Sequence, residues 1–339
     1  MKPKNFSLLL FLVIFPTLSL LGCTPKPYHD ITNLISSQAF PSPEGEYESV
    51  VWLDDDLIAF IYRPQELIVS QSNENFRIAI FEISSGKSKD MPLPTLSSNS
   101  YCTPERSWIS ELTKLPDGSL GFMFSCRSAE DTLYLLDTDT EVLTNWNTYY
   151  GILAKKFSFS PDMSRLIQED GSGGGLSESL LLVSSDRTMK KLLPDYQRAR
   201  SPVWAADGET IFFAGTKENP ENADSLTWIW IEDLFFYPWD IYRMDSDGKN
   251  PKIVLPSVGT IYDLKFSPVD ENLLLFAGTS FDKKTGIWLL DTKDLSIKRI
   301  WNENPNSYDW SPDGTKIVVL NNRVNVWATS VTIINLEDH

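Results

Sequence analysis

The sequence predicts an all-β protein, a six-bladed β-propeller with four-stranded antiparallel blades. A turn of the Pro-Asp-Gly type occurs six times along the 339 residues, and each turn joins two strand-like apolar runs. The intervals between the six turn aspartates are 62, 45, 45, 63 and 43 residues. These aspartates are Asp55, Asp117, Asp162, Asp207, Asp270 and Asp313. Since one four-stranded blade takes about 45 residues, we expect six blades, with insertions in the first and fourth.

The last copy of the turn, Ser311-Pro312-Asp313-Gly314, shows why the motif forms a hairpin. Proline presets φ at the first corner, aspartate bonds to its own backbone, and glycine takes the positive φ that closes a tight turn. The following run, residues 315–320, is β-branched and apolar, as expected of a buried inner strand. Each unit then continues into a second hairpin, as in residues 286–300, so that four strands are expected per unit.

The sixth unit has three of its four strands, because the sequence ends at His339 soon after the run 331–336. The stretch Ile31–Phe40 lies upstream of the first unit and has no other assignment. We expect this stretch to pair with the last unit and close the ring, since a propeller must protect the edges of its sheets.

Residues 1–22 have the pattern of a lipoprotein signal peptide. Lys2 and Lys4 precede a short apolar run, which leads to Leu20-Leu21-Gly22-Cys23. This motif resembles a bacterial lipobox, which implies that Cys23 carries lipid, including palmitate. Residues 23–45 are then a lipidated tether with the ring-closing strand, and the protein is expected to be extracytoplasmic on a bacterial membrane. Thr24 in place of Asp favours the outer membrane in a cell with two membranes.

Residues 159–166 and 310–317 share an aromatic-x-Ser-Pro-Asp pattern that resembles the propeller repeats of the TolB family. The resemblance covers residues 46–339 and implies a six-bladed propeller. The TolB protein places an α/β domain before its propeller, whereas only residues 23–45 separate signal and first unit here. The resemblance therefore implies the fold and not the role of TolB.

Cys102 and Cys126 are expected near the same end of one hairpin in the second unit. Export exposes them to an oxidising compartment, which favours a disulfide, with two buried thiols as the alternative. A catalytic thiol is not expected, because the two histidines, His29 and His339, lie in terminal segments. The same distribution argues against a Ser-His-Asp site or a histidine metal centre, and we expect no cofactor and no metal.

The formal net charge is −16, and it becomes −18 without Lys2 and Lys4. Nucleic acid is therefore not an expected partner. Acidic residues fall mostly at turn positions, where aspartate is expected for local backbone bonding. For this reason we expect the protein not to be an enzyme. The alternative is a carboxylate-dependent enzyme that acts on polysaccharide, with facing acids around an open central channel.

The insertion in the fourth unit is rich in aromatic residues. Its candidate binding residues are Trp228, Trp230, Phe235, Phe236, Tyr237 and Trp239. Aromatic anchors dominate protein interfaces and also stack on sugars. The alternative is a hairpin extension with Trp228 and Trp230 packed inward. The sequence thus predicts a non-catalytic binding or scaffold module for an envelope protein or glycan. Other large aromatics, including Trp52, Trp204, Trp288 and Trp310, are expected to pack between blades.

Overall fold

The computed structural model describes twelve stretches of the chain. They are residues 28–32, 36–40, 45–64, 76–93, 107–126, 130–150, 156–170, 179–193, 198–216, 239–280, 284–321 and 330–336. The regular structure within these stretches consists of strands, and none of their residues belongs to a helix able to cross a membrane. The prediction of an all-β fold built from four-stranded antiparallel sheets is confirmed.

The first three sheets each contain four strands that are consecutive in sequence and antiparallel to their neighbours. The first consists of β3 (Gly45–Trp52), β4 (Leu57–Pro64), β5 (Arg77–Glu82) and β6 (Lys87–Asp90). The second consists of β7 (Ser107–Lys114), β8 (Leu120–Cys126), β9 (Glu130–Leu136) and β10 (Leu143–Tyr150). The third consists of β11 (Phe157–Phe159), β12 (Arg165–Asp170), β13 (Ser179–Ser184) and β14 (Met189–Leu192).

The fourth and fifth repeat units share one eight-stranded sheet, because the strand between them is continuous. The first half of this strand, β18 (Lys252–Phe266), pairs with β17 and its second half pairs with β19. The other strands are β15 (Arg198–Trp204), β16 (Thr210–Thr216), β17 (Trp239–Asp245), β19 (Leu273–Thr279), β20 (Thr285–Asp291) and β21 (Ile297–Trp301). A short strand, β1 (His29–Asp30), adds to β21 in parallel.

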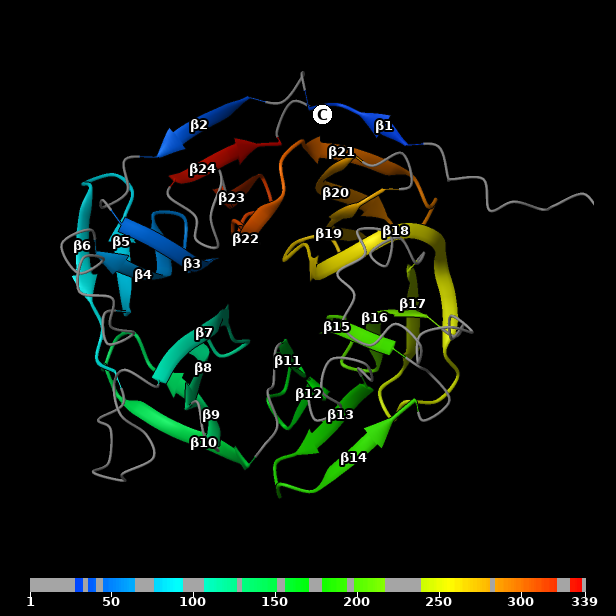
Figure 1. Cartoon of the computed structure of the whole chain (residues 1–339), viewed down its shortest axis with the longest axis horizontal. Coiled ribbons are helices and arrows are strands. Elements are labelled where there is room, and N and C mark those ends of the chain that lie inside the picture. Colours follow the sequence, from blue (N-terminus) through cyan, green and yellow to red (C-terminus); the bar gives the residue numbers. More distant parts are fainter. Residues whose placement is uncertain are drawn as a thin grey trace, which may run out of the picture.

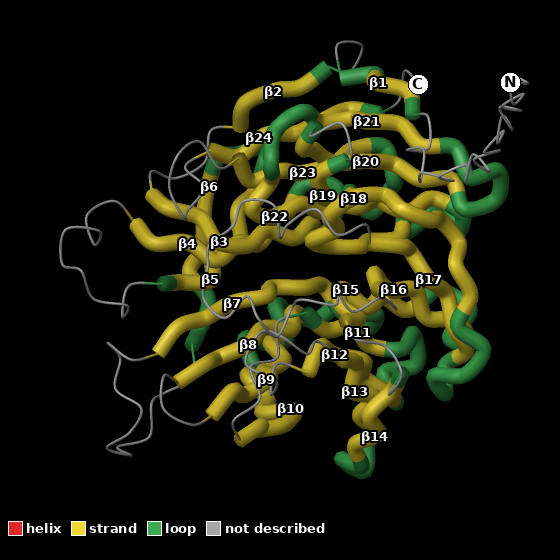
Figure 2. The backbone as a smooth tube through the Cα atoms, turned by 45° about the vertical axis from the view of Figure 1, so that its right-hand side comes forward, coloured by secondary structure: helices red, strands yellow, loops and turns green. Residues whose placement is uncertain are grey.

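The last sheet combines the two ends of the described chain. It contains β22 (Pro305–Trp310), β23 (Lys316–Asn321) and β24 (Ser330–Asn335), and its outermost strand is β2 (Ser37–Phe40). The pairing of β2 with β24 is antiparallel, with Ser37 opposite Ile334 and Phe40 opposite Val331. Figure 2 shows β1 and β2 following one another along the outer side of β21 and β24. Figure 1 shows the sheets arranged around a common centre, with β3, β7, β11, β15 and β22 innermost.

The repeated turns have the local chemistry that the motif predicts. Asp313 accepts hydrogen bonds from the Thr315 backbone nitrogen at 3.0 Å and from the Thr315 hydroxyl at 2.8 Å. Gly314 has a φ of +70°, which glycine adopts without steric cost. Asp162 accepts equivalent bonds from Ser164. These aspartates fix the turns and are thereby committed to local structure.

The hydrophobic core lies between neighbouring repeat units. Trp52, for example, packs in one cluster with Val318 and Leu320 of β23, and Trp310 packs with Leu275 of β19. The four tryptophans expected between blades are at most 6% exposed, and each belongs to such a cluster. They are Trp52, Trp204, Trp288 and Trp310. Their predicted packing role is confirmed.

Candidate functional site: the central cavity

The innermost strands carry irregularities at corresponding places. Strands β3, β7, β15 and β22, and the second half of β18, have a shift of pairing register with the next strand of their sheet. The strand register skips Glu48, Glu111, Ser201 and Tyr262 at these β-bulges. A β-bulge re-aims a side chain out of the regular alternation of a strand. The bulges therefore allow the inner strands to present polar groups toward the centre.

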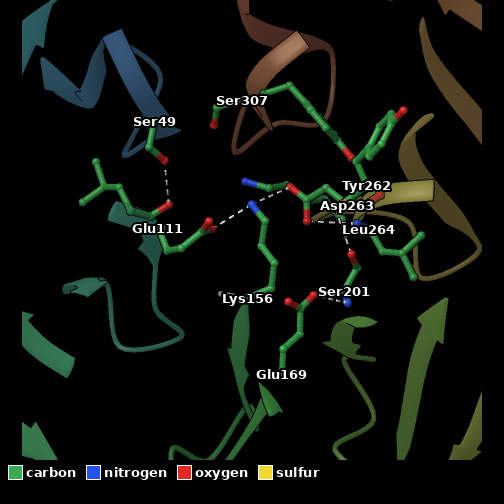
Figure 3. A network of polar contacts seen from close by, with 12 residues as sticks. Ser49, Glu111, Lys156, Glu169, Ser201, Tyr262, Asp263, Leu264 and Ser307 are labelled. Carbon is green, nitrogen blue, oxygen red and sulfur yellow. Dashed lines mark hydrogen bonds and ion pairs between the residues drawn. The ribbon is translucent and has the colours of Figure 1, made fainter. Parts of the chain in front are cut away.

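Lys156, which immediately precedes β11, is the positive centre of this region. Its Nζ lies 2.7 Å from Oε2 of Glu111 and 3.5 Å from Oδ2 of Asp263. Figure 3 shows the lysine reaching between these two carboxylates, which come from β7 and β18. Burial lowers the pKa of Lys156, but Asp263 and Glu111 outweigh it, so the pKa is raised well above its usual value. Lys156 is therefore an ammonium at any physiological pH.

Glu169 extends the network from the second strand of the third sheet. The side chain of Glu169, which is buried on β12, accepts a hydrogen bond from the Ser201 backbone nitrogen at 2.7 Å. The Ser201 hydroxyl donates in turn to the Tyr262 carbonyl oxygen at 2.9 Å. This chain of contacts links the third, fourth and fifth repeat units close to Lys156 (Figure 3). It holds the inner strands at a fixed mutual distance around the charged groups.

Glu48, at the bulge of β3, is a carboxyl group in an unfavourable environment. Burial and the neighbouring negative charge of Glu111 raise its pKa to about 8, against a smaller opposing effect of Lys156. Its Oε2 is fully buried and has no hydrogen-bond partner among the described residues. Such an orphaned acceptor is unusual in a folded protein and calls for an explanation.

Glu111 shares this environment and adds backbone strain. Burial raises its pKa, with Lys156 acting in the opposite direction. Its φ of +56° lies in the left-handed region, which residues other than glycine rarely adopt. Strain of this kind costs about 1–3 kcal/mol and concentrates at functional sites. The end of the inner strands that carries the β-bulges, here called the bulge end, thus combines buried carboxyl groups with a strained backbone.

At the ends of the inner strands that lead into the repeated turns, here called the turn end, each charged group contacts a group of opposite charge or a backbone group. The Nζ of Lys265 lies 3.1 Å from Oδ1 of Asp309. Oδ2 of Asp309 accepts a hydrogen bond from the Trp52 backbone nitrogen at 2.9 Å. Lys114 donates to the carbonyl oxygen of Leu53. Because each of these contacts joins two neighbouring units, the charges also tie the inner strands together.

A cavity of about 600 Å³ occupies the space between the inner strands. Its charged lining comprises Glu111, Lys114, Lys156, Asp263, Lys265 and Asp309. Its aromatic lining comprises Trp52, Phe157, Phe159, Trp204, Phe266 and Trp310. This volume is typical of small-molecule sites, in which apolar walls carry a few oriented polar groups. Within the described stretches, no group of three or more His, Cys, Asp or Glu residues is placed to hold a metal ion.

The sequence-predicted site residues fall mostly outside the described stretches. Cys126 ends β8, whereas the positions of Cys23, Cys102, Trp228, Trp230, Phe235, Phe236 and Tyr237 lie outside. Trp239 begins β17, is 5% exposed, and lies beneath the Arg200 guanidinium, which is 4.1 Å from its ring centroid. Lipidation at Cys23, the Cys102–Cys126 disulfide and the aromatic binding patch remain predictions.

None of the cavity network was among the sequence-predicted site residues. A signal for it exists in the repeat itself. A polar or charged residue occurs six or seven positions before each of the six turn aspartates. These residues are Glu48, Glu111, Lys156, Ser201, Asp263 and Ser307. Aligning the units on their turns would have placed all six at one level of the centre.

Comparison with known proteins supports the architecture. No model of a protein family matches the chain, and no curated protein matches it. The crystal structure of TolB from Acinetobacter baumannii has a TM-score of 0.59 and 14% identity, over 83% of this chain and 63% of that one. A putative TolB from Agrobacterium tumefaciens has a TM-score of 0.50 and 19% identity, over 74% and 79% of the two chains.

The fold is a TolB-like β-propeller. At these identities the similarity concerns the fold alone. The chain also spans less than two thirds of the Acinetobacter TolB chain, at 63%. The predicted resemblance to TolB is confirmed at the level of architecture.

One similar structure corrects the prediction that the protein is not an enzyme. An oligogalacturonate lyase in complex with manganese has a TM-score of 0.52 and 11% identity, over 93% of this chain and 82% of that one. Catalysis therefore occurs on this fold. The prediction was wrong to argue from the turn aspartates, because these are structural and say nothing against catalysis elsewhere on such a fold.

Proposed function

We propose that the protein is a lipid-anchored, extracytoplasmic propeller that binds an envelope protein or glycan, with the central cavity as part of its binding site. The cavity carries this proposal: about 600 Å³ lined by aromatic rings and by charged groups from several repeat units. Rigid scaffolds commonly bind ligands in such cavities. The aromatic insertion of residues 217–238 provides the second proposed contact surface.

Affinity capture from envelope extract tests the proposal with three forms of the purified protein. The wild type is compared with Lys265→Met, which alters the cavity wall, and with Trp228→Ala/Trp230→Ala, which alters the insertion. Trp239 is left intact because its ring is buried in the core. We expect the wild type to retain a protein or glycan. At least one variant of equal thermal stability should retain less of it. Equal retention by all three would reject both surfaces.

The proposed lipid anchor at Cys23 has a separate test. Cells given radiolabelled palmitate should incorporate label into the wild type and not into a Cys23→Ala variant. Label that persists on the variant would contradict lipidation at this position.

Mass measurement before and after reduction tests the proposed Cys102–Cys126 disulfide in the same preparation. Reduction should increase the mass by that of two hydrogens.

For the fold we propose six blades, with the ring closed by β2. The proposal is supported by the division of β18 between two neighbouring units and by the place of β2 outside β24. Deleting residues 36–40 should lower the thermal stability substantially. Deleting residues 33–35, which precede β2, is the matched control, and equal melting temperatures would contradict closure.

A carboxylate-dependent enzyme acting on polysaccharide is the second candidate. It is favoured by the facing acids Glu111 and Asp263 at the cavity and by the occurrence of a lyase on this fold. A panel of acidic and neutral polysaccharides should then reveal release of oligosaccharides by the wild type. A Glu111→Gln variant should lose at least about tenfold in rate if this carboxyl group acts on a proton.

A further inference from the structure

The charged lining of the central cavity is balanced, with three ammonium groups and three carboxyl groups. The Nζ of Lys156 lies 2.7 Å from Oε2 of Glu111 and 3.5 Å from Oδ2 of Asp263 (Figure 3). The Nζ of Lys265 lies 3.1 Å from Oδ1 of Asp309. These five side chains are 15–31% exposed, so each can still contact a molecule in the cavity. The cavity therefore offers both charges at close spacing, without a surplus of either.

This pairing disfavours a charged ligand. An anion bound to Lys265 would draw its ammonium away from Asp309. A cation bound to Glu111 would compete with Lys156. Either ligand would leave one partner of a partly buried pair uncompensated, which is strongly unfavourable. A purely apolar ligand is disfavoured too, because it would remove water from these groups without replacing its hydrogen bonds. The ligand should therefore be polar and uncharged.

A hydroxyl group can bind beside such pairs without breaking them. It accepts a hydrogen bond from an ammonium and donates one to a carboxylate at the same time. An ammonium has three donors. Among the described residues, Lys265 uses one of its donors on Asp309, and Lys114 uses one on the carbonyl oxygen of Leu53. Both lysines therefore keep donors for the hydroxyl groups of a ligand.

A peptide is the alternative uncharged ligand, and it would bind by adding a strand to the inner edge of a sheet. On β3 and β15, side chains of a neighbouring repeat unit already occupy this edge. The Trp52 backbone nitrogen donates to Oδ2 of Asp309 at 2.9 Å. The Trp204 backbone nitrogen donates to the Ser158 hydroxyl at 3.1 Å. Main-chain donors that a peptide strand would need are thus engaged on these two strands.

The apolar part of the lining suits the carbon skeleton of a sugar. Pro116, Pro161 and Pro268, from three of the repeated turns, are exposed residues of the cavity wall, and Phe266 is half-buried. A pyranose ring carries hydroxyl groups at its edge and C–H groups on its faces, so it can contact both the apolar and the charged wall. The volume of about 600 Å³ is that of about twenty waters, which is room for a disaccharide.

We infer that the central cavity binds a neutral saccharide, whose hydroxyl groups contact the Lys265–Asp309 pair and the donors of Lys114. This inference rests on the proposed binding function and names the ligand class of the same cavity.

Calorimetry with neutral disaccharides tests the inference on the purified protein. The probes are cellobiose, maltose, lactose and N,N′-diacetylchitobiose, each up to about 10 mM, a concentration at which a weak site also fills. We expect the wild type to bind at least one of them. Lys265→Met should bind it at least about tenfold more weakly, as expected for loss of a hydrogen bond from a charged group.

Lys89→Met is the matched control and should bind as the wild type, because Lys89 is an exposed residue of the outer strand β6. Thermal melts establish that the variants are folded. Lys114→Met is a second cavity variant that should also weaken binding, so that the test stands if Lys265→Met does not fold.

The remaining probes test the charge and the class of the ligand. The deacetylated, cationic form of chitobiose and the anionic digalacturonate should each bind at least about tenfold more weakly than the best neutral disaccharide. Tighter binding of either charged sugar, or of a blocked trialanine peptide, would overturn the inference. So would a lack of response to all four neutral disaccharides, or equal affinity of the wild type and both cavity variants. Envelope capture that persists in these cases would leave the proposed binding function standing.

Discussion

Acidic side chains at the two ends of the inner strands have opposite environments. At the turn end, hydrogen bonds from Ser160 and Ser164 lower the pKa of Asp162 to about 2. At the bulge end, burial and Glu111 raise the pKa of Glu48 to about 8. The turn aspartates are ionised and satisfied by the backbone beside them, whereas the bulge glutamates are crowded and incompletely paired. Position along an inner strand thus decides whether its surroundings favour or disfavour the ionised form of a carboxyl group.

Removal of the bulge-end cation should have the largest effect on stability. Lys156→Met keeps most of the side-chain volume but leaves Glu111 and Asp263 without their ammonium. We expect the free energy of unfolding to fall by about 2–3 kcal/mol, below the full cost of breaking a buried pair because the groups are partly exposed.

Lys89→Met is the matched control for this variant in chemical denaturation. Lys89 pairs with Glu141 at 2.5 Å, but the two side chains are 63% and 45% exposed. Loss of such a surface pair should cost less than about 1 kcal/mol. Equal losses of unfolding free energy would show that the ammonium of Lys156 contributes no more to stability than that of a surface lysine.

The pH dependence of stability separates the two ends further. Since the folded pKa of Glu48 is about 8, above its ordinary 4.5, its stabilising contribution is complete below pH 4.5 and is lost as the pH rises through 8. The slope reaches at most about 1.4 kcal/mol per pH unit. Glu48→Gln should flatten the decline between pH 6 and 8 in urea unfolding curves. If the variant shows the same decline of unfolding free energy as the wild type, the decline is due to another group.

At the turn end a smaller effect with the opposite pH dependence is expected. Hydrogen bonds from Ser311 and Thr315 lower the pKa of Asp313, so its contribution is present above the ordinary pKa of 3.8 and is lost as the pH falls below it. Asp313→Ala should lower the free energy of unfolding by about 1 kcal/mol at pH 7, as for a typical hydrogen bond. The difference from the wild type should shrink toward pH 3. A difference that grows at low pH would contradict the assigned role.

The two ends also differ in how far the sequence predicts them. The turn end depends on contacts within a few residues, such as those of Asp313 with Ser311 and Thr315, so the motif itself specifies the structure. The bulge end depends on strand register and on the approach of distant segments. Lys156 and Asp263 are 107 positions apart, one immediately before β11 and the other on β18. Their spacing before the turns was visible, but which residues meet across the centre was not.

The parallel strand β1 has a mechanical consequence. Ile31 donates to the Arg299 carbonyl oxygen at 3.0 Å, Arg299 bonds Asp30 at 3.1 Å, and Tyr28 stacks edge-on against Trp288 at 4.7 Å. A pull along the chain from its N-terminal side loads these contacts together in shear before tension reaches β2. A pull from the N-terminal side therefore meets the contacts of residues 28–32 before it meets the β2–β24 pairing.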